Sequence, residues 1–264
     1  MKGINRMNAL VTVVTPAFNA EKTLHECIRS IRGQTYHNWE HIIVDDGSTD
    51  GTWCCLQRYS AEDSRIRIVG QANSGQSKAR NVAICEARGK YIALLDADDQ
   101  SVPKRLELQV EFLEANPDVD VVGGSIVNLS EEGEVLGVSS LPATHEDLAI
   151  NIFRRNPFFT STVMARREFF VDLYGFDETL RRVEDHDLWL RGYRSFRYHN
   201  MQIPLSYYRH RRRISWSDAL HSARVIVRSV RRDNAPTLCL LQAARPLGSR
   251  VLRVLGLRKP PWYR

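Results

Sequence analysis

YIALLDADD (residues 91–99) joins five apolar residues directly to a cluster of carboxylates. An apolar run of this length that ends in turn-forming residues is typical of a buried strand. Side chains two apart in an extended backbone point to the same side, so Asp96 and Asp98 can face one site while Asp99 begins the loop. Carboxylates this close repel one another unless a cation or hydrogen-bond donors compensate them, and Mg²⁺ or Mn²⁺ is the natural compensator. The alternative is that Asp98 or Asp99 only caps the turn before a helix at Pro103.

Outward from this stretch, apolar strands alternate with amphipathic helices through the first half of the chain. The predicted strands lie at 10–15, 41–44, 65–69 and 91–95, and the predicted helices at 24–31, after 50, at 77–87 and from 103 to 116. Such alternation predicts an α/β fold with a mainly parallel sheet and helices on both faces. The pattern then weakens into strands at 119–129 and 160–165, a hairpin arm at 131–137 and a helix at 145–155, which complete the same domain.

Two other predicted strands also end in polar or turn-forming residues. The first strand closes on PAFN (16–19) and the second on DDGSTDG (45–51). Ligands of open parallel sheets bind outside the carboxyl ends of the strands, so these segments should border one crevice with the carboxylates of the fourth strand. Each segment has a simpler explanation. The second is also an ordinary turn with Asp50 as a helix N-cap, and a lone aromatic such as Phe18 is more often core than the lining of a base pocket.

Two later segments carry candidate ligand-binding or catalytic side chains. VEDHDLWLR (183–191) begins with acids and continues with an apolar stripe, which predicts a helix with an acidic first turn. The acids either complement the helix dipole or include a general base, Asp185, that takes a proton from an incoming hydroxyl. NSGQSKARN (73–81) is a glycine-containing loop that opens a helix, with Lys78 and Arg80 available to contact phosphate or ribose. It lacks the spacing of a Rossmann fingerprint or a P-loop, which argues against a dehydrogenase or an ordinary P-loop kinase.

Composition limits the class of protein further. The 264 residues are 43% hydrophobic and 26% charged, which is enough for one sizeable core. The five cysteines have no CxxC spacing, which favours reduced thiols over disulfides or zinc. We see neither a secretory signal nor an apolar run of about 20 residues, so we expect a cytoplasmic protein, at most peripheral on the inner face of the cell membrane. The net charge of +6 concentrates toward the C-terminus, which divides the chain into a globular domain at 8–216 and a basic helical tail at 217–264.

Taken in order, these segments resemble the family 2 glycosyltransferases, whose members have the GT-A fold. The resemblance runs from about residue 10 to 215 and is carried by VTVVTPAFNAE (11–21), IIVDDGSTDGT (42–52), NSGQSKARN (73–81), YIALLDADD (91–99) and YGFDETLRRVEDHDLWLR (174–191). It implies a metal-dependent, inverting transfer of a sugar from a nucleotide-diphosphate donor, such as a UDP-sugar, to an acceptor hydroxyl. Cell-envelope polysaccharide or lipopolysaccharide synthesis is the expected setting.

The resemblance also implies roles for individual residues. Asp98 would be the principal ligand of Mg²⁺ or Mn²⁺, with Asp99 beside it, and Asp185 would deprotonate the acceptor hydroxyl. Asp46 would accept a hydrogen bond from the uracil ring nitrogen if the donor is a UDP-sugar. The residues expected to bind the nucleotide are Pro16, Phe18, Asp46, Arg80 and Asp96. In relatives a basic residue near the end of the domain helps to close the diphosphate site; YRHRRR (208–213) lies there but departs from the usual spacing, so we assign none of its residues.

The expected partners are a nucleotide-sugar donor and a saccharide or lipid-linked saccharide acceptor. The arginines and apolar residues of the tail can also lie on an anionic membrane surface, and the alternative is a solvated helix or one packed in a homodimer. Two rival functions remain: a metal-dependent nucleotidyltransferase, which would release pyrophosphate, and a non-catalytic glycosyltransferase-like binding scaffold. A nucleic-acid binder rests only on the positive net charge, and the acidic crevice argues against it.

Overall fold

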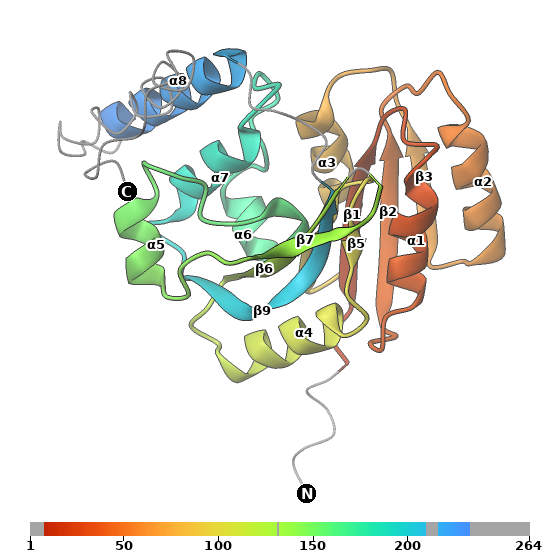
Figure 1. The fold of residues 1–264 in the computed structure, drawn as a ribbon, viewed down its shortest axis with the longest axis horizontal. Coiled ribbons are helices and arrows are strands. Elements are labelled where there is room, and N and C mark those ends of the chain that lie inside the picture. The colour runs from red at the N-terminus through yellow and green to blue at the C-terminus, as the bar shows by residue number, and fades with distance from the viewer. Residues whose placement is uncertain (1–7, 131, 210–215, 233–264) are drawn as a thin grey trace, which may run out of the picture.

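The computed structural model describes residues 8–130, 132–209 and 216–232 (Figure 1). Within them the strands are β1 (Val11–Ala17), β2 (Trp39–Asp45), β3 (Ile66–Gly70), β4 (Tyr91–Leu94), β5 (Gln100–Ser101), β6 (Val121–Leu129), β7 (Val135–Ser139), β8 (Met164–Arg166) and β9 (Tyr198–Arg209). The helices are α1 (Leu24–Arg32), α2 (Thr52–Glu62), α3 (Gln76–Cys85), α4 (Arg105–Ala115), α5 (His145–Asn151), the 3₁₀ turn η1 (Thr160–Thr162), α6 (Arg167–Asp172), α7 (Glu184–Gly192) and α8 (Trp216–Arg232).

The described strands form one mixed sheet in the order β3-β2-β1-β4-β8-β6-β9-β5, with β7 paired to β6. The predicted parallel arrangement is found in its first half, where β1 pairs in parallel with β2 and β4, and β2 with β3. The second half is mixed, because β8 runs antiparallel to both β4 and β6, while β9 is parallel to β6. The α/β fold with flanking helices is therefore confirmed, and the sheet is less parallel than its first half predicts.

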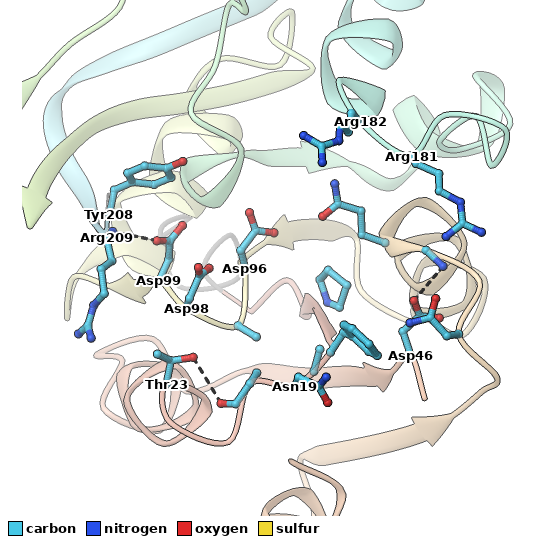
Figure 2. A pocket seen from close by; sticks show the side chains of 18 residues that line it. Asn19, Thr23, Asp46, Asp96, Asp98, Asp99, Arg181, Arg182, Tyr208 and Arg209 are labelled. Atoms are coloured by element: carbon cyan, nitrogen blue, oxygen red, sulfur yellow. Dashed lines mark hydrogen bonds between the residues drawn. The ribbon is translucent and has the colours of Figure 1, made fainter. Parts of the chain in front are cut away.

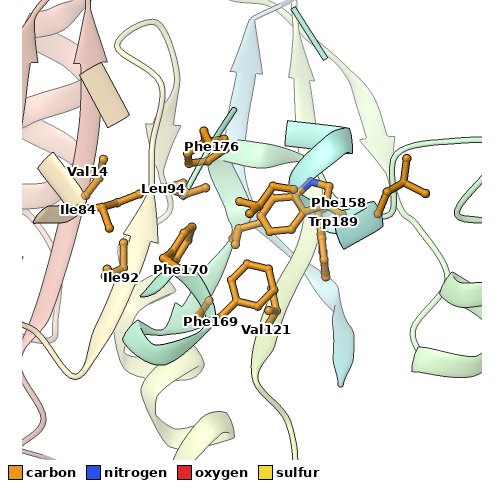
Figure 3. Close-up of a cluster of buried hydrophobic side chains, with 14 of the residues drawn as sticks. Val14, Ile84, Ile92, Leu94, Val121, Phe158, Phe169, Phe170, Phe176 and Trp189 are labelled. Carbon is orange, nitrogen blue, oxygen red and sulfur yellow. The ribbon is translucent and has the colours of Figure 1, made fainter. Parts of the chain in front are cut away.

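Helices cover both faces of the sheet, so the sheet separates two apolar cores. Successive residues of a strand point to opposite faces, and Val13 and Val14 of β1 accordingly belong to different cores. The core that contains Val13 is closed by α1, α2 and α4. The core that contains Val14 is closed by α3, α5, α6, α7 and α8, and Figure 3 shows its central aromatic side chains, among them Phe169 and Trp189. Both cores end where the strands end. The carboxyl ends of β1, β2 and β4 are therefore followed by polar loops at one edge of the sheet.

Three predicted elements have different bounds in the structure. α4 begins at Arg105, and Pro103 lies in the turn before it rather than in its first turn. The strand predicted at 160–165 is η1 followed by the short β8, because the Thr162 hydroxyl donates to the Phe159 carbonyl and pulls the chain into a turn. The helix predicted to reach 155 ends at Asn151, and the chain continues in turns in which Ile152 and Arg154 donate to carbonyls three residues earlier.

The tail predicted to be helical begins with α8, and residues 233–264 lie outside the described residues. Val225, Ile226 and Val230 of α8 are buried in the same core as α7, over which α8 lies in Figure 1. These three apolar side chains of α8 are thus packed against the protein itself. In the parts of the chain that the structure describes, no helix has both the length and the apolar character that crossing a bilayer requires.

Candidate active site

A cleft of about 580 Å³ opens at the carboxyl ends of β1, β2 and β4 (Figure 2). Its size falls within the range of small-molecule sites. The loops that follow these three strands supply one side of it, and segments that precede α7 and end β9 supply the other. The lining residues are Pro16, Ala17, Phe18, Asn19, Ala20, Thr23, Asp46, Asn73, Gly75, Gln76, Asp96, Ala97, Asp98, Asp99, Arg181, Arg182, Tyr208 and Arg209.

The acidic motif after β4 reaches the cleft with all three carboxylates. Asp96 and Asp98 are partly exposed there, whereas Asp99 is buried. Asp99 accepts hydrogen bonds from the Ser161 hydroxyl and from the backbone N–H of Arg209, at 3.3 Å. Burial, followed by the charges of Asp96 and Asp98, raises the pKa of Asp99 well above its usual value. The charges of Asp96 and Asp98 thus act on Asp99 in addition to its burial.

This donor set fits a hard divalent cation by its chemistry. Carboxylate oxygens are the protein ligands that Mg²⁺ and Mn²⁺ prefer, and such ions commonly use one or two carboxylates together with substrate phosphates. The crowding of Asp96, Asp98 and Asp99 at the end of one strand favours a cation, because a positive charge would reduce the repulsion among them. Among the described residues, no three His, Cys, Asp or Glu side chains converge as a complete protein cage would require. An ion held by one or two of these carboxylates would take its other ligands from water or from a bound molecule.

At the β1 end of the cleft, Phe18 exposes half of its surface, 50%. The interpretation of Phe18 as a core residue is wrong, since the ring lines the cleft together with Pro16. The neighbouring Asn19 holds the β1 and β2 loops together: its side-chain oxygen accepts from the Thr49 N–H at 2.8 Å, and its own N–H donates to the Ser48 hydroxyl at 2.9 Å. The exposed ring is thereby presented on a hydrogen-bonded loop pair.

Asp46 lines the cleft, yet its carboxylate is mostly engaged by the loop before α3. It accepts hydrogen bonds from the Gln71 side chain at 2.6 Å and from the backbone N–H groups of Ser74 and Gly75, both at 2.8 Å. The close fit of this loop depends on Gly47, which has a φ of 75° and whose added Cβ would lie 2.8 Å from the Asn73 nitrogen. An ionised carboxylate has about four acceptor positions, so Asp46 retains room for one ligand donor.

Arg80 lies behind the cleft wall rather than in the cleft. Its guanidinium is buried and forms ion pairs with Asp96 at 2.7 Å and with Glu184 at 2.6 Å. The position differs from our expectation that Arg80 contacts phosphate or ribose directly, because Asp96 stands between it and the open cleft. Lys78, the other basic residue of this loop, is exposed and does not line the cleft either. Sequence spacing could not reveal the two carboxylate partners, which arrive from other parts of the fold.

Asp185 lies in the first turn of α7, as predicted, but is not among the lining residues of the cleft. One of its oxygens accepts from the Asn156 side chain and from the Thr160 hydroxyl, both at 2.7 Å. The other accepts from the N–H of His186, so the carboxylate also serves the helix N-terminus. Asp185 nevertheless acts electrostatically on a residue of the cleft. Tyr208 lines the cleft, and its pKa is raised first by burial and then by the carboxylates of the acidic motif and of Asp185.

Sequence reasoning missed two arginines that border the cleft. Figure 2 shows Arg181 and Arg182 on the side of the cleft opposite Thr23 and Asn19. In the sequence they were only two charges ahead of an acidic helix start, a pattern that a solvated surface shows equally well. Arg209, from the basic run that we could not assign, also lines the cleft and pairs with Glu26 at 2.8 Å. The cleft thus has carboxylates on its floor and guanidinium groups on its rim.

Comparison with known proteins places this geometry in a family. Residues 12–174 match the family model described as Glycosyl transferase family 2, which covers the first six helices and leaves α7 outside. A Bacillus subtilis (strain 168) protein named "Putative glycosyltransferase EpsE" is 36% identical over 246 residues, which are 90% of this chain and 87% of that protein.

Two solved structures share the fold. Staphylococcus aureus TarS 1-349 superimposes with a TM-score of 0.70 at 23% identity, over 90% of this chain and 72% of TarS 1-349, and TarS 1-349 has also been solved with UDP-GlcNAc. The mannosyltransferase PcManGT of Pyrobaculum calidifontis, solved with GDP-Man and Mn²⁺, gives 0.63 at 20% identity over 95% of this chain and 76% of that chain. These similarities confirm the GT-A fold that the sequence predicted. The chain belongs to glycosyl transferase family 2.

Proposed function

We propose that the protein transfers a sugar from a nucleoside-diphosphate-sugar, with a UDP-sugar as the first choice, to an acceptor hydroxyl with inversion at the anomeric carbon. The observation that carries the proposal is the presence, in one cleft, of an exposed aromatic ring at Phe18 and of the three carboxylates at 96–99. A nucleoside diphosphate needs both an apolar surface for its base and a counter-ion for its phosphates. The nucleotide sugars bound by TarS and PcManGT support this choice of ligand.

In this proposal the donor lies along the floor of the cleft. Pro16, Phe18 and Asp46 border the nucleoside, and Asp96 meets the ribose. Asp98, with Asp99 beside it, would hold Mg²⁺ or Mn²⁺, which supplies charge stabilisation for the departing diphosphate.

Arg181 and Arg182 face that side of the cleft and are suited to contact phosphate oxygens. Arg80 supports Asp96 from behind, and so acts on the nucleotide through it.

Asp185 would act as the general base. Asn156 and Thr160 donate to one carboxylate oxygen, which fixes the plane of the group without neutralising its charge. The acceptor hydroxyl would approach from the side of η1 and β9, lose its proton to Asp185 and attack the anomeric carbon opposite the leaving nucleoside diphosphate. Because Asp185 is not among the lining residues of the cleft, the acceptor would have to reach from Asp185 to the bound donor.

The setting that we propose is the inner face of the cell membrane, with a saccharide or lipid-linked saccharide of the cell envelope as acceptor. We assign residues 8–216 to catalysis and 217–264 to a basic extension. Arg224, on the outer side of α8, is exposed, whereas the apolar residues Val225 and Ile226 are buried. Attraction to an anionic surface would therefore be electrostatic rather than insertion of α8.

Vesicle co-sedimentation tests that location. Deleting 233–264 leaves the buried residues of α8 in place, so the remaining domain should fold while binding to anionic vesicles falls. Vesicles of neutral lipid are the control, since they should bind neither form. Equal sedimentation of the two forms with anionic vesicles would dismiss the membrane role and leave a homodimer contact to be tested by oligomeric state.

Calorimetric titration of UDP, dTDP and GDP, with and without Mn²⁺, tests the proposed function. We expect one nucleotide to bind in a metal-dependent way and the binding to be lost in Asp98→Ala. Absence of binding to all three with metal present would favour the scaffold alternative. Once a donor sugar is found, the released product separates the other rival: a nucleoside diphosphate supports transfer of a sugar, and pyrophosphate would indicate a nucleotidyltransferase.

A further inference from the structure

Arg80 is a buried charge shared between two carboxylates that belong to different parts of the fold. One guanidinium nitrogen lies 2.7 Å from Asp96, which faces the cleft after β4. The other lies 2.6 Å from Glu184, the first residue of α7, which is buried and does not line the cleft. Through these two ion pairs, Arg80 connects the candidate donor site to the first turn of α7, which carries Asp185.

The same face of α3 holds the whole segment that leads into α7. Gln76 donates to the carboxylate of Glu184 at 2.6 Å, and the Ser77 hydroxyl donates to the Leu180 carbonyl at 2.8 Å. Asn81 both donates to the carbonyl of Phe176 and accepts from its N–H. Arg80 is the charged member of this set, and among these side chains it is the one whose bonds extend to the acidic motif. Residues 176–184 are thus fixed to α3 along their length.

The bonding of this trio is incomplete, which makes it responsive to its surroundings. In the described part of the chain, Arg80 Nε and Glu184 Oε2 are buried without a hydrogen-bond partner. One positive charge serves two negative charges in an environment of low dielectric, where a change at one carboxylate is felt at the other. A cation or a ribose hydroxyl that engages Asp96 alters the share of the guanidinium charge that Glu184 receives.

We propose that Arg80 is a positioning residue that couples occupation of Asp96 by a metal-bound nucleoside diphosphate to the placement of the first turn of α7. The identity of that ligand rests on the proposed function, whereas the coupling between the two carboxylates does not. Its consequence is that Asp185 is held in its working position most firmly when the donor is bound. This order of events favours transfer. If the base takes its working position only after the donor has bound, an acceptor that arrives before the donor is not deprotonated without a sugar to attack.

Hydrogen exchange in the protein without ligand tests the coupling. The amide of Asp187 makes the first backbone hydrogen bond of α7, to the Val183 carbonyl at 3.1 Å, and is the reporter. We expect Asp96→Asn to slow its exchange several-fold, by up to about tenfold, because Arg80 then pairs wholly with Glu184. Asp98→Asn is the matched control, since it removes the same charge from the same cleft and leaves both ion pairs of Arg80 intact. Equal effects of the two variants, or none, would overturn the proposal.

A second measurement follows the coupling in the opposite direction. Glu184→Gln lies outside the cleft, yet it should weaken the binding of UDP with Mn²⁺ several-fold, because Arg80 then pairs wholly with Asp96. In an Arg80→Lys background, whose single ammonium cannot bridge both carboxylates, this effect of Glu184→Gln should disappear. An equal weakening in both backgrounds would mean a direct field effect and contradict the proposal.

Variants of buried charges can fail to fold, and the ligand itself is part of a separate proposal. The pair Arg80→Met with Glu184→Gln removes both fully buried charges together, while Asp96, whose side chain is 30% exposed, keeps access to solvent. This pair serves if Arg80→Lys is unstable. If no nucleotide binds the unmodified protein, the proposed function fails, while the exchange comparison still decides the role of Arg80.

Discussion

Arg228 of α8 and Asp177 form an ion pair of 2.8 Å, which joins the C-terminal helix to the segment that leads into α7. The arginine is largely exposed, so the pair itself contributes little stability. Its position is informative, because Asp177 lies just beyond residue 174, where the match to the family model ends. The candidate base and the two rim arginines belong to this part of the chain and depend on α3 and α8 for their placement.

Ile226→Ala should lower the free energy of unfolding by about 2–5 kcal/mol, because it leaves a cavity between α8 and the core. Arg224→Ala, two residues earlier on the exposed side, should change it by about 0.5 kcal/mol or less. Urea denaturation followed by circular dichroism measures both. A small effect of Ile226→Ala would mean that α8 is not docked on the core in solution.

Phe18→Ala should weaken nucleotide binding while leaving stability nearly unchanged. The ring is half exposed, so little core packing is lost, whereas stacking of a base on an aromatic ring contributes about 1–3 kcal/mol. We expect the dissociation constant of UDP with Mn²⁺ to rise about tenfold, measured by calorimetry. Tyr174→Ala, which removes an exposed ring outside the cleft, is the control and should bind UDP normally. Normal binding by Phe18→Ala would remove this residue from the base site.

Gly47→Ala should disrupt the loop that Asp46 organises. The residue has a φ of 75°, and the new Cβ would meet the backbone of Asn73 at 2.8 Å, so strain and a backbone shift both follow. We expect a loss of about 1–3 kcal/mol in stability and a marked loss of nucleotide affinity. Gly133→Ala also has a positive φ, of 90°, but open space around it. The Gly133→Ala variant should therefore lose less stability than Gly47→Ala and should bind nucleotide as the unmodified protein does.

His41 should make the protein sensitive to acid. Burial lowers the pKa of His41 to about 3, while an unfolded histidine titrates near 6.5. Below about pH 6.5 the unfolded chain therefore binds a proton that the folded protein does not, so stability falls as pH falls, by about 1.4 kcal/mol per pH unit until about pH 3.

The variant His41→Gln removes this dependence, and its stability from pH 7 to 5 should fall less steeply in urea titrations than that of the unmodified protein. His186 is also buried with a lowered pKa, so some slope should remain. The variant His37→Gln alters an exposed histidine and should keep the full slope. Equal slopes for the unmodified protein and His41→Gln would contradict the assignment.

The sequence predicted most of the parallel half of the sheet because its signals are local. Each apolar run predicted as a strand in residues 10–95 forms one strand, and each is followed directly in the sequence by polar or turn-forming residues. In the second half, the short β8 and the turn at η1 depend on side-chain contacts such as that of Thr162, which no periodicity encodes. The bounds predicted there were accordingly less accurate.

By itself, then, the sequence determined the α/β class, the family and the carboxylate cluster at 96–99, since adjacent residues at the end of one strand must lie together. Only the tertiary structure decided which charged groups face the cleft. Arg80 lies outside the cleft because it pairs with Asp96 and Glu184, which are 16 and 104 residues away in the chain. Arg181, in contrast, lines the cleft. The physical reason is that a buried charge takes its position from the partners that neutralise it, and those partners meet only when the chain folds.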